Sequence, residues 1–224
     1  MNRLYRINLL FGEDAVNKLK KSTVMVVGCG AVGSFAIEAL ARSGIGHIIL
    51  IDFDKVEETN INRQLFALDS TVGKPKVEIA KKRIVDINPN IVVNVFNTFF
   101  DDNTDLDIKP DFVIDAIDTV ASKIALYKWC MDKNIPFISS MGAARKTDLT
   151  KVKVDKISKT SVCPLASKVR RMVRELNMKD FPVVYSTEVA THQKNSGREF
   201  GSVITVTGMF GLMLSDFVIK KLIS

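Results

Sequence analysis

The sequence contains little cysteine, with Cys29, Cys130 and Cys163 the only three in 224 residues. Three cysteines cannot form a disulfide framework or fill a four-cysteine zinc site. Such a low number is typical of proteins from a reducing compartment, so we expect a cytoplasmic protein. The first ten residues, MNRLYRINLL, also lack the apolar core and the small-residue cleavage site of a secretory signal peptide.

The composition lacks the marks of disorder, of collagen-like repeats and of a coiled coil. Hydrophobic residues make up 46% of the chain and charged residues 25%, as in an ordinary folded protein. We find no internal repeat and no low-complexity tract. The chain is long enough to bury most of its apolar surface in one core. We therefore expect a single domain over 1–224, with one half at 1–144 and the other at 145–224.

The formal net charge of +7 is unevenly distributed along the chain. Residues 1–144 hold 17 basic and 18 acidic residues, whereas residues 145–180 hold 11 basic and 4 acidic ones. A local excess of positive charge is typical of a surface that binds a polyanion. It is equally compatible with a solvated basic helix face that has no partner.

Apolar, β-branched runs alternate with helical patterns through the first half. The expected strands are 23–27, 47–52, 91–96, 112–117 and 136–140, and the expected helices are 31–43, 74–87 and 122–133. This alternation predicts an α/β fold with a doubly wound, mostly parallel, Rossmann-like sheet that carries helices on both faces.

The pattern changes after residue 145 and predicts a basic C-terminal α+β extension. The expected elements are strands at 151–154 and 183–187, a helix at 165–177, a polar loop at 193–198 and an apolar helix at 202–222. The apolar helix has about the length that spans a bilayer. It contains Asp216, Lys220 and Lys221, so we expect a packed helix and no stable membrane insertion.

A glycine-rich turn follows the first expected strand and precedes a helix. It reads Gly28-Cys-Gly30-Ala-Val-Gly33, which is the G-x-G-x-x-G pattern in its strand–turn–helix setting. Such a turn lets the backbone approach phosphates at the N-terminus of the helix. Asp52 ends the next strand, where it can accept hydrogen bonds from a ribose. This pattern alone predicts a nucleotide site, and NAD is its first interpretation.

Charged and polar side chains at the same sheet edge change that interpretation. Asn60 and Arg63 follow the second strand, Lys76 begins the next helix, and Asp118 follows the fourth strand. Two cations and an acid exceed what a dinucleotide needs and suit ATP, with Mg²⁺ held by Asp118. Taken singly, Arg63 and Lys76 are equally well explained as surface charges.

Several spaced motifs between residues 20 and 145 resemble the ThiF/MoeB and ubiquitin-activating superfamily. They are GCGAVG, LIDFDKVEETNINRQ, VGKPKVE, INP and VIDAID. The resemblance implies adenylation of a carboxylate with ATP and Mg²⁺. The residues it implies for binding the nucleotide are Gly28, Gly30, Gly33, Asp52, Asn60, Arg63 and Lys76. It implies Arg63, Lys76 and Asp118 as catalytic residues, with Asp118 also the metal ligand.

The same resemblance implies a homodimer in which each subunit lends an arginine to the site of the other. Arg3 and Arg6 are the two candidates near the N-terminus. Arg3 is preferred for its position relative to Phe11 and Gly12.

The second half resembles one branch of this superfamily, the tRNA threonylcarbamoyladenosine dehydratases. The similar stretches are KTSVCPLASKVRR, VVYSTE and REFGSVITVTGMFGLMLSDFVIKK. This resemblance implies that the threonyl carboxylate, next to the anticodon of tRNA, is adenylated and that ring closure then expels AMP. The alternative is an adenylyltransferase that activates the C-terminus of a small sulfur-carrier protein, but its usual paired C-x-x-C motifs are absent. An NAD-linked oxidoreductase and a non-catalytic RNA-binding module agree less well with the ATP-site residues.

The branch also gives the basic region a role. The resemblance implies that Lys168, Arg170, Arg171 and Arg174 contact tRNA phosphates, which position a substrate without reading its sequence. Whether Ser186, Thr187 and Glu188 bind a monovalent cation or the substrate remains open, as do a sulfur-transfer partner protein and a reactive Cys163. Ring closure within the substrate needs no thioester carrier, which argues against a catalytic Cys163.

Overall fold

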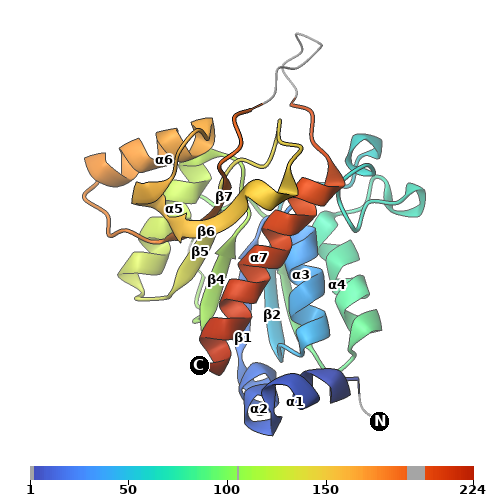
Figure 1. Cartoon of the computed structure of the whole chain (residues 1–224). Coiled ribbons are helices and arrows are strands. Elements are labelled where there is room, and N and C mark those ends of the chain that lie inside the picture. The colour runs from blue at the N-terminus through green and yellow to red at the C-terminus, as the bar shows by residue number, and fades with distance from the viewer. Residues whose placement is uncertain (1–2, 105, 191–199) are drawn as a thin grey trace.

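Seven strands of the described chain form one mostly parallel sheet (Figure 1). The computed structural model describes residues 3–104, 106–190 and 200–224, so the predicted polar loop at 193–198 lies outside the described residues. The strands are β1 (Thr23–Val27), β2 (His47–Ile51), β3 (Val92–Phe96), β4 (Phe112–Asp115), β5 (Phe137–Ser140), β6 (Val152–Lys156) and β7 (Pro182–Ser186). Their order is β3-β2-β1-β4-β5-β7-β6, and only the pairing of β6 with β7 is antiparallel.

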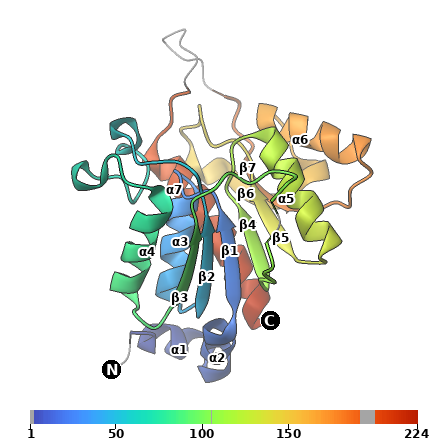
Figure 2. The ribbon, with the colours of Figure 1, turned by 180° about the vertical axis from the view of Figure 1, so that it is seen from behind.

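Helices cover both faces of the sheet (Figures 1 and 2). One face carries α3 (Gly33–Ser43), α4 (Lys76–Ile87) and α7 (Ile204–Ile223), and the other carries α5 (Val120–Asp132) and α6 (Pro164–Glu175). Four short 3₁₀ helices lie in the described connections, at Glu58–Asn60, Asp69–Thr71, Leu149–Lys151 and Ile157–Lys159. The predicted doubly wound α/β fold is therefore confirmed.

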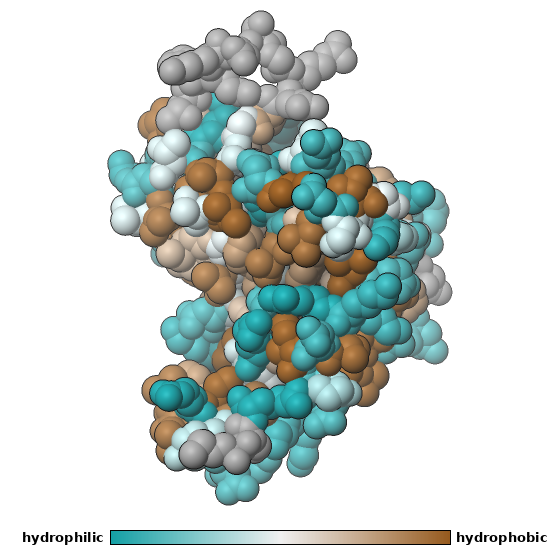
Figure 3. All heavy atoms as spheres, turned by 90° about the vertical axis from the view of Figure 1, so that its right-hand side faces the viewer, coloured by the Kyte–Doolittle hydropathy of each residue, from teal (hydrophilic) through white to brown (hydrophobic). Residues whose placement is uncertain are grey.

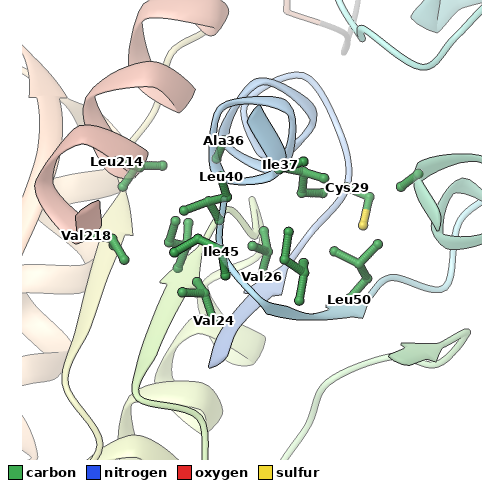
Figure 4. Packing of buried hydrophobic residues seen from close by; sticks show 14 of the residues in the cluster. Val24, Val26, Cys29, Ala36, Ile37, Leu40, Ile45, Leu50, Leu214 and Val218 are labelled. Carbon is green, nitrogen blue, oxygen red and sulfur yellow. The ribbon is translucent and has the colours of Figure 1, made fainter. Parts of the chain in front are cut away.

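The two helical layers explain why β1 and β2 are apolar after their first residues. Val24 and Val26 of β1 pack into the core under α3 and α7, whereas Met25 and Val27 pack into the core under α5 and α6. Because successive strand residues point to opposite faces, a strand covered on both faces has no solvent-facing positions. Figure 4 shows Leu40 of α3 and Leu214 of α7 directed toward this first core.

The second half extends the same sheet. Strand β7 pairs with β5 in parallel, β6 pairs with β7, and α7 packs against α3. The basic α+β extension therefore continues the sheet and adds one helix to each of its helical layers. Among the described helices, none is both long and apolar enough to cross a membrane.

Some element boundaries differ from those predicted. Helix α4 begins at Lys76 because Pro75 is its N-cap residue. Strand β4 ends at Asp115, two residues earlier than predicted, and the chain then turns toward α5. Helix α6 ends at Glu175, and Asn177 just beyond it adopts a positive φ of 50° that cannot continue a helix.

The N-terminal helices were not predicted. They are α1 (Tyr5–Phe11) and α2 (Glu13–Lys21), and they lie below the sheet in Figure 1, at the end opposite the carboxyl ends of the parallel strands. Helix α2 buries Ala15, Val16 and Leu19, whereas α1 has no buried residue.

Candidate functional site

The glycine-rich turn joins β1 to α3 in a backbone shape that other residues cannot adopt. Gly28 has a φ of +98°, and a Cβ at this position would lie 2.7 Å from the carbonyl oxygen of Ala116. A Cβ at Gly33 would lie 1.8 Å from the carbonyl oxygen of Gly28. The turn therefore packs directly against the end of β4, and the N-terminus of α3 is free to face an anion.

A cleft of about 660 Å³ opens over this turn, at the carboxyl ends of the parallel strands. Its size is within the range of small-molecule sites, and its position is the usual ligand site of such sheets. The predicted residues that line it are Gly28, Gly30, Asp52, Asn60, Arg63, Lys76 and Asp118. Sequence motifs that are spread over 91 positions thus lie around one cavity. Gly33 does not line the cleft but packs against the backbone of Gly28 within the turn.

Asp52 is fixed at the end of β2 by two backbone hydrogen bonds. The N–H of Cys29 donates to Oδ2 at 2.6 Å, and the N–H of Asp54 donates to Oδ1 at 2.8 Å. Burial raises the pKa of Asp52, and these bonds and the nearby Lys76 oppose that effect. Each oxygen keeps a lone pair, so the carboxylate can still accept hydrogen bonds from a ribose.

The two predicted cations differ in their surroundings. Lys76 is buried, and its Nζ lies 2.8 Å from Oδ2 of Asp54, which is itself half exposed. Arg63 is less enclosed, and its Nη1 donates to the carbonyl oxygen of Thr59 at 2.7 Å and to Oδ1 of Asn62 at 2.9 Å. A bound polyphosphate would therefore meet one cation already held in place and one with further N–H groups available.

Two buried amides complete this side of the cleft. Oδ1 of Asn60 accepts from the N–H of Glu57 at 3.2 Å, and this hydrogen bond caps the short 3₁₀ helix Glu58–Asn60. Gln64 is also buried and lines the cleft. Sequence reasoning missed Gln64, although its spacing from Asn60, one helical turn on, was a usable signal.

Asp118 follows β4 and precedes α5, so it lies across the glycine turn from Asp52, which follows β2. Its carboxylate is exposed to the cleft and has no hydrogen-bond partner among the described residues. The chain reaches it through a tight turn, in which the N–H of Ile117 donates to Oδ1 of Asp115 at 3.0 Å. Asp118 is thus positioned by the backbone and remains available to a ligand.

A fully buried ion pair, which we did not predict from the sequence, supports that turn. Nζ of Lys123 donates to Oδ2 of Asp115 at 2.7 Å and to the carbonyl oxygen of Ser140 at 2.8 Å. The hydroxyl groups of Tyr127 and Ser139 donate to the same Asp115 oxygen, at 2.9 and 2.5 Å. The cluster ties the end of β4 to the end of β5, and both of these strands lead into the cleft.

Arg3 lies far from the cleft of its own chain. Its Nη1 donates to the carbonyl oxygen of Ile87 at 2.7 Å, and it lines a cavity at the amino ends of β2 and β3. Within one chain it is therefore not a member of the ATP site. Arg6 is exposed on α1.

The basic residues of α6 do not form one uniform surface. Lys168, Arg171 and Arg174 are exposed, whereas Arg170 is half-buried and donates from Nη1 to the carbonyl oxygen of Thr160 at 2.8 Å. Arg170 therefore braces α6 against the preceding segment. Its predicted role in tRNA contact is weakened by this bond, because part of its guanidinium is already used.

Cys163 and the segment 186–188 have structural partners. Sγ of Cys163 caps α6 by accepting from the N–H of Ala166 at 3.5 Å. The Glu188 carboxylate accepts from the N–H groups of Thr147 and Asp148 at 3.0–3.1 Å. In the part of the chain that the structure describes, no group of three or more His, Cys, Asp or Glu could hold a metal ion.

Comparison with known proteins gives consistent matches. The chain matches the ThiF family over residues 1–224. A tRNA threonylcarbamoyladenosine dehydratase of Bacillus subtilis (strain 168) is 48% identical over 192 residues, which cover 84% of this chain and 76% of the relative. The crystal structure of Escherichia coli tRNA N6-threonylcarbamoyladenosine dehydratase, TcdA, in complex with ATP superposes with a TM-score of 0.92, at 37% identity, and covers 98% of this chain and 93% of that one.

A more distant similarity covers less of the chain. The molybdopterin-synthase adenylyltransferase of Escherichia coli (strain K12) is 36% identical over 142 residues, which is 62% of this chain and 57% of the relative. The similarity to the dehydratases, in contrast, extends into the second half, where β6, α6, β7 and α7 lie.

Proposed function

The chain belongs to the ThiF family, and from this premise we propose that it catalyses the ATP-dependent dehydration of threonylcarbamoyladenosine in tRNA. One observation carries the proposal: the ATP-type cleft is combined with similarity to the dehydratases along nearly the whole chain. The adenylyltransferase similarity covers a smaller part of the chain, 62% against 98% for the dehydratase structure. In this proposal the substrate is tRNA and the reaction takes place in the cytoplasm.

In the proposed first step, each part of the cleft has a role. The N–H groups of the turn at 28–33 bind the phosphates, and Asp52 binds the ribose. The threonyl carboxylate attacks the α-phosphorus, a carboxylate oxygen–phosphorus bond forms, and pyrophosphate leaves. Arg63 and Lys76 stabilise the charge that moves onto the leaving pyrophosphate.

The second step occurs within the substrate. A nucleophilic atom of the same modified nucleoside loses its proton and attacks the activated carbonyl carbon. The carbon–oxygen bond to the adenylate breaks, AMP leaves with the former carboxylate oxygen, and a ring closes. The net change is loss of one water from the nucleoside, which ATP cleavage drives. Attachment of the nucleophile to its target makes a covalent enzyme intermediate unnecessary.

Asp118 is the residue that fits magnesium in this cleft. Magnesium binds proteins through one or two carboxylates together with phosphate oxygens and waters. An exposed, unpaired carboxylate beside the phosphate turn matches this donor set. When bound, the ion would supply positive charge to the polyphosphate.

Mass spectrometry of the nucleoside tests the function directly. Enzyme, ATP and tRNA that carries threonylcarbamoyladenosine are incubated, the tRNA is digested, and the nucleoside is weighed. We expect loss of one water together with release of AMP. An unchanged nucleoside, combined with ATP-dependent adenylation of a small sulfur-carrier protein, would favour the adenylyltransferase alternative.

Exposed cations of α6 are expected to contact tRNA phosphates. Replacement of Lys168, Arg171 and Arg174 by alanine should weaken tRNA binding and reduce the slope of log Kd against log salt by about three units, one for each cation. Filter binding at several salt concentrations measures this slope.

A matched control replaces three exposed lysines on other elements, namely Lys20, Lys21 and Lys82. This control should leave the salt slope unchanged. If both triple variants behave alike, α6 is not part of the tRNA-binding surface.

The homodimer and its cross-subunit arginine are also part of the proposal. Helix α1 exposes Leu9 and Leu10 at 70% and 73%, and Figure 3 shows hydrophobic atoms at this lower end of the molecule. A second copy that covers this face would bring the exposed Arg6 toward a partner. Arg3 is less available to a partner subunit, because its guanidinium donates a hydrogen bond to the carbonyl oxygen of Ile87.

Complementation between inactive variants tests the shared site. We expect Arg6→Ala to be inactive alone, and a mixture of Arg6→Ala with Lys76→Ala to recover part of the activity, because a mixed dimer contains one intact site. Arg3→Ala serves as the comparison. Recovery with Arg3→Ala and full activity of Arg6→Ala would instead assign the role to Arg3.

A further inference from the structure

Exposed aromatic side chains line the cleft on two different sides. Phe53 and Phe99 are 55% and 42% exposed, and their rings meet edge to face with centroids 4.9 Å apart. They follow β2 and β3, and Phe53 is the direct neighbour of Asp52. Since Asp52 is the residue placed to bind the ribose, this pair lies where the adenosine part of ATP binds.

The second aromatic position belongs to the other half of the chain. Phe200 lines the cleft and is 64% exposed, and Cζ of Arg145 lies 5.9 Å from the centroid of its ring. Arg145 follows β5, and its N–H donates to the carbonyl oxygen of Gly201 at 2.8 Å. Arg145 has a φ of 61°, a conformation that residues other than glycine rarely adopt.

The order of the strands separates these two positions. In the sheet, β2 lies on one side of β1, whereas β4 and then β5 lie on the other. The glycine turn that binds the phosphates follows β1, so it lies between the two aromatic positions. Leu165, the second residue of the basic helix α6, lines the cleft on the same side as the segment after β5.

The reaction requires two nucleosides to meet at one phosphorus atom. The adenosine of ATP extends from the α-phosphate toward Asp52 and Phe53, so a second substrate must approach from the β5 side. Among the cleft-lining residues that the structure describes, Phe200 is the exposed aromatic on that side. An exposed ring beside a cation is a common platform for a nucleobase, because every base has a π face.

Resting on the proposed function, we infer that Phe200 and Arg145 form the binding site for a nucleobase of the tRNA substrate, either the modified adenine or a base stacked beside it. Phe200 stacks on the base, and the Arg145 guanidinium contacts the base or its adjacent phosphate. The segment 200–202 is held on both sides of the cleft, because Nδ2 of Asn62 donates to the carbonyl oxygen of Ser202 at 3.2 Å. Binding of ATP and of tRNA is thus assigned to different aromatic residues.

Steady-state kinetics with two variants tests this assignment. We expect Phe200→Ala to raise the KM for tRNA about tenfold or more and to leave the KM for ATP within twofold of the wild type. Phe99→Ala is the matched control, which should raise the KM for ATP instead. Phe200→Trp should keep the KM for tRNA near the wild-type value, because a larger ring still stacks. Arg145→Asn, which tolerates the positive φ, should raise the KM for tRNA without loss of stability.

The outcomes separate this inference from the proposed function. A wild-type enzyme that does not dehydrate the nucleoside overturns both. An active wild type with an unchanged KM for tRNA in Phe200→Ala overturns the inference alone. A rise in the KM for ATP in Phe200→Ala would also overturn it, because Phe200 would then lie against the nucleotide. Circular dichroism and the Tm of each variant show that the exposed substitution leaves the fold intact.

Discussion

Replacement of Lys76 by alanine is expected to lower ATP-dependent AMP formation by about 100- to 1,000-fold, which is the usual effect of removing one fixed electrostatic contact from a transition state. Lys76 is buried at the cleft wall and is already held by Asp54, so its charge needs no reorganisation when the pyrophosphate leaves. Measurement of AMP by chromatography under saturating ATP and tRNA gives the rate. Arg63→Ala should show a loss of the same kind, because Arg63 lines the same side of the cleft.

The neighbouring Lys74 provides a matched control for this experiment. Its Nζ donates to the carbonyl oxygen of Ser70 at 2.7 Å, and it does not line the cleft. Lys74→Ala should therefore retain wild-type activity. Asp54 is 46% exposed at its side chain, so water can solvate it once Lys76 is gone, and the fold should remain stable. Full activity of Lys76→Ala would refute its role in catalysis.

The sequence predicted the architecture well because local patterns determine it. Short apolar, β-branched runs such as 48–51 are typical of strands buried on both faces, and the glycine turn at 28–33 is typical of the step from a strand into a helix at a sheet edge. Once the sheet is parallel, its topology brings Asp52 and Asp118 to the same edge, although 66 positions separate them. Residues that follow strand ends were therefore predictable as one site.

Residues whose partners lie far away in the sequence were not predictable in this way. Nothing in the local pattern around Arg170 indicates that Thr160 will accept its hydrogen bond, so it was grouped with the exposed cations of α6. Arg3 lies at the amino ends of the strands, away from the cleft of its own chain. This position depends on α1 and α2, which we did not predict as helices from the sequence. The pairing of Lys123 with Asp115 needs β4, β5 and α5 to be packed together.

That buried pair leads to the second large expected effect, on stability. Lys123→Met should lower the free energy of unfolding by about 3–5 kcal/mol, because it leaves the Asp115 carboxylate fully buried with no opposing charge. Asp115 keeps its hydrogen bonds from Tyr127 and Ser139, but these donors are neutral. Urea denaturation followed by circular dichroism measures the loss.

The same helix contains the control that separates burial from charge. Lys128 forms an exposed ion pair with Asp102 at 3.2 Å, and Lys128→Met should cost less than about 1 kcal/mol, as exposed pairs do. The double variant Lys123→Met/Asp115→Asn removes the unpaired charge and should recover part of the stability lost in Lys123→Met. Its activity should stay low even so, because the turn that carries Asp118 is then tied less firmly to the end of β5. Equal losses for Lys123→Met and Lys128→Met would show that the buried pair contributes no more than a surface contact, and full activity of the double variant would show that the turn is positioned without it.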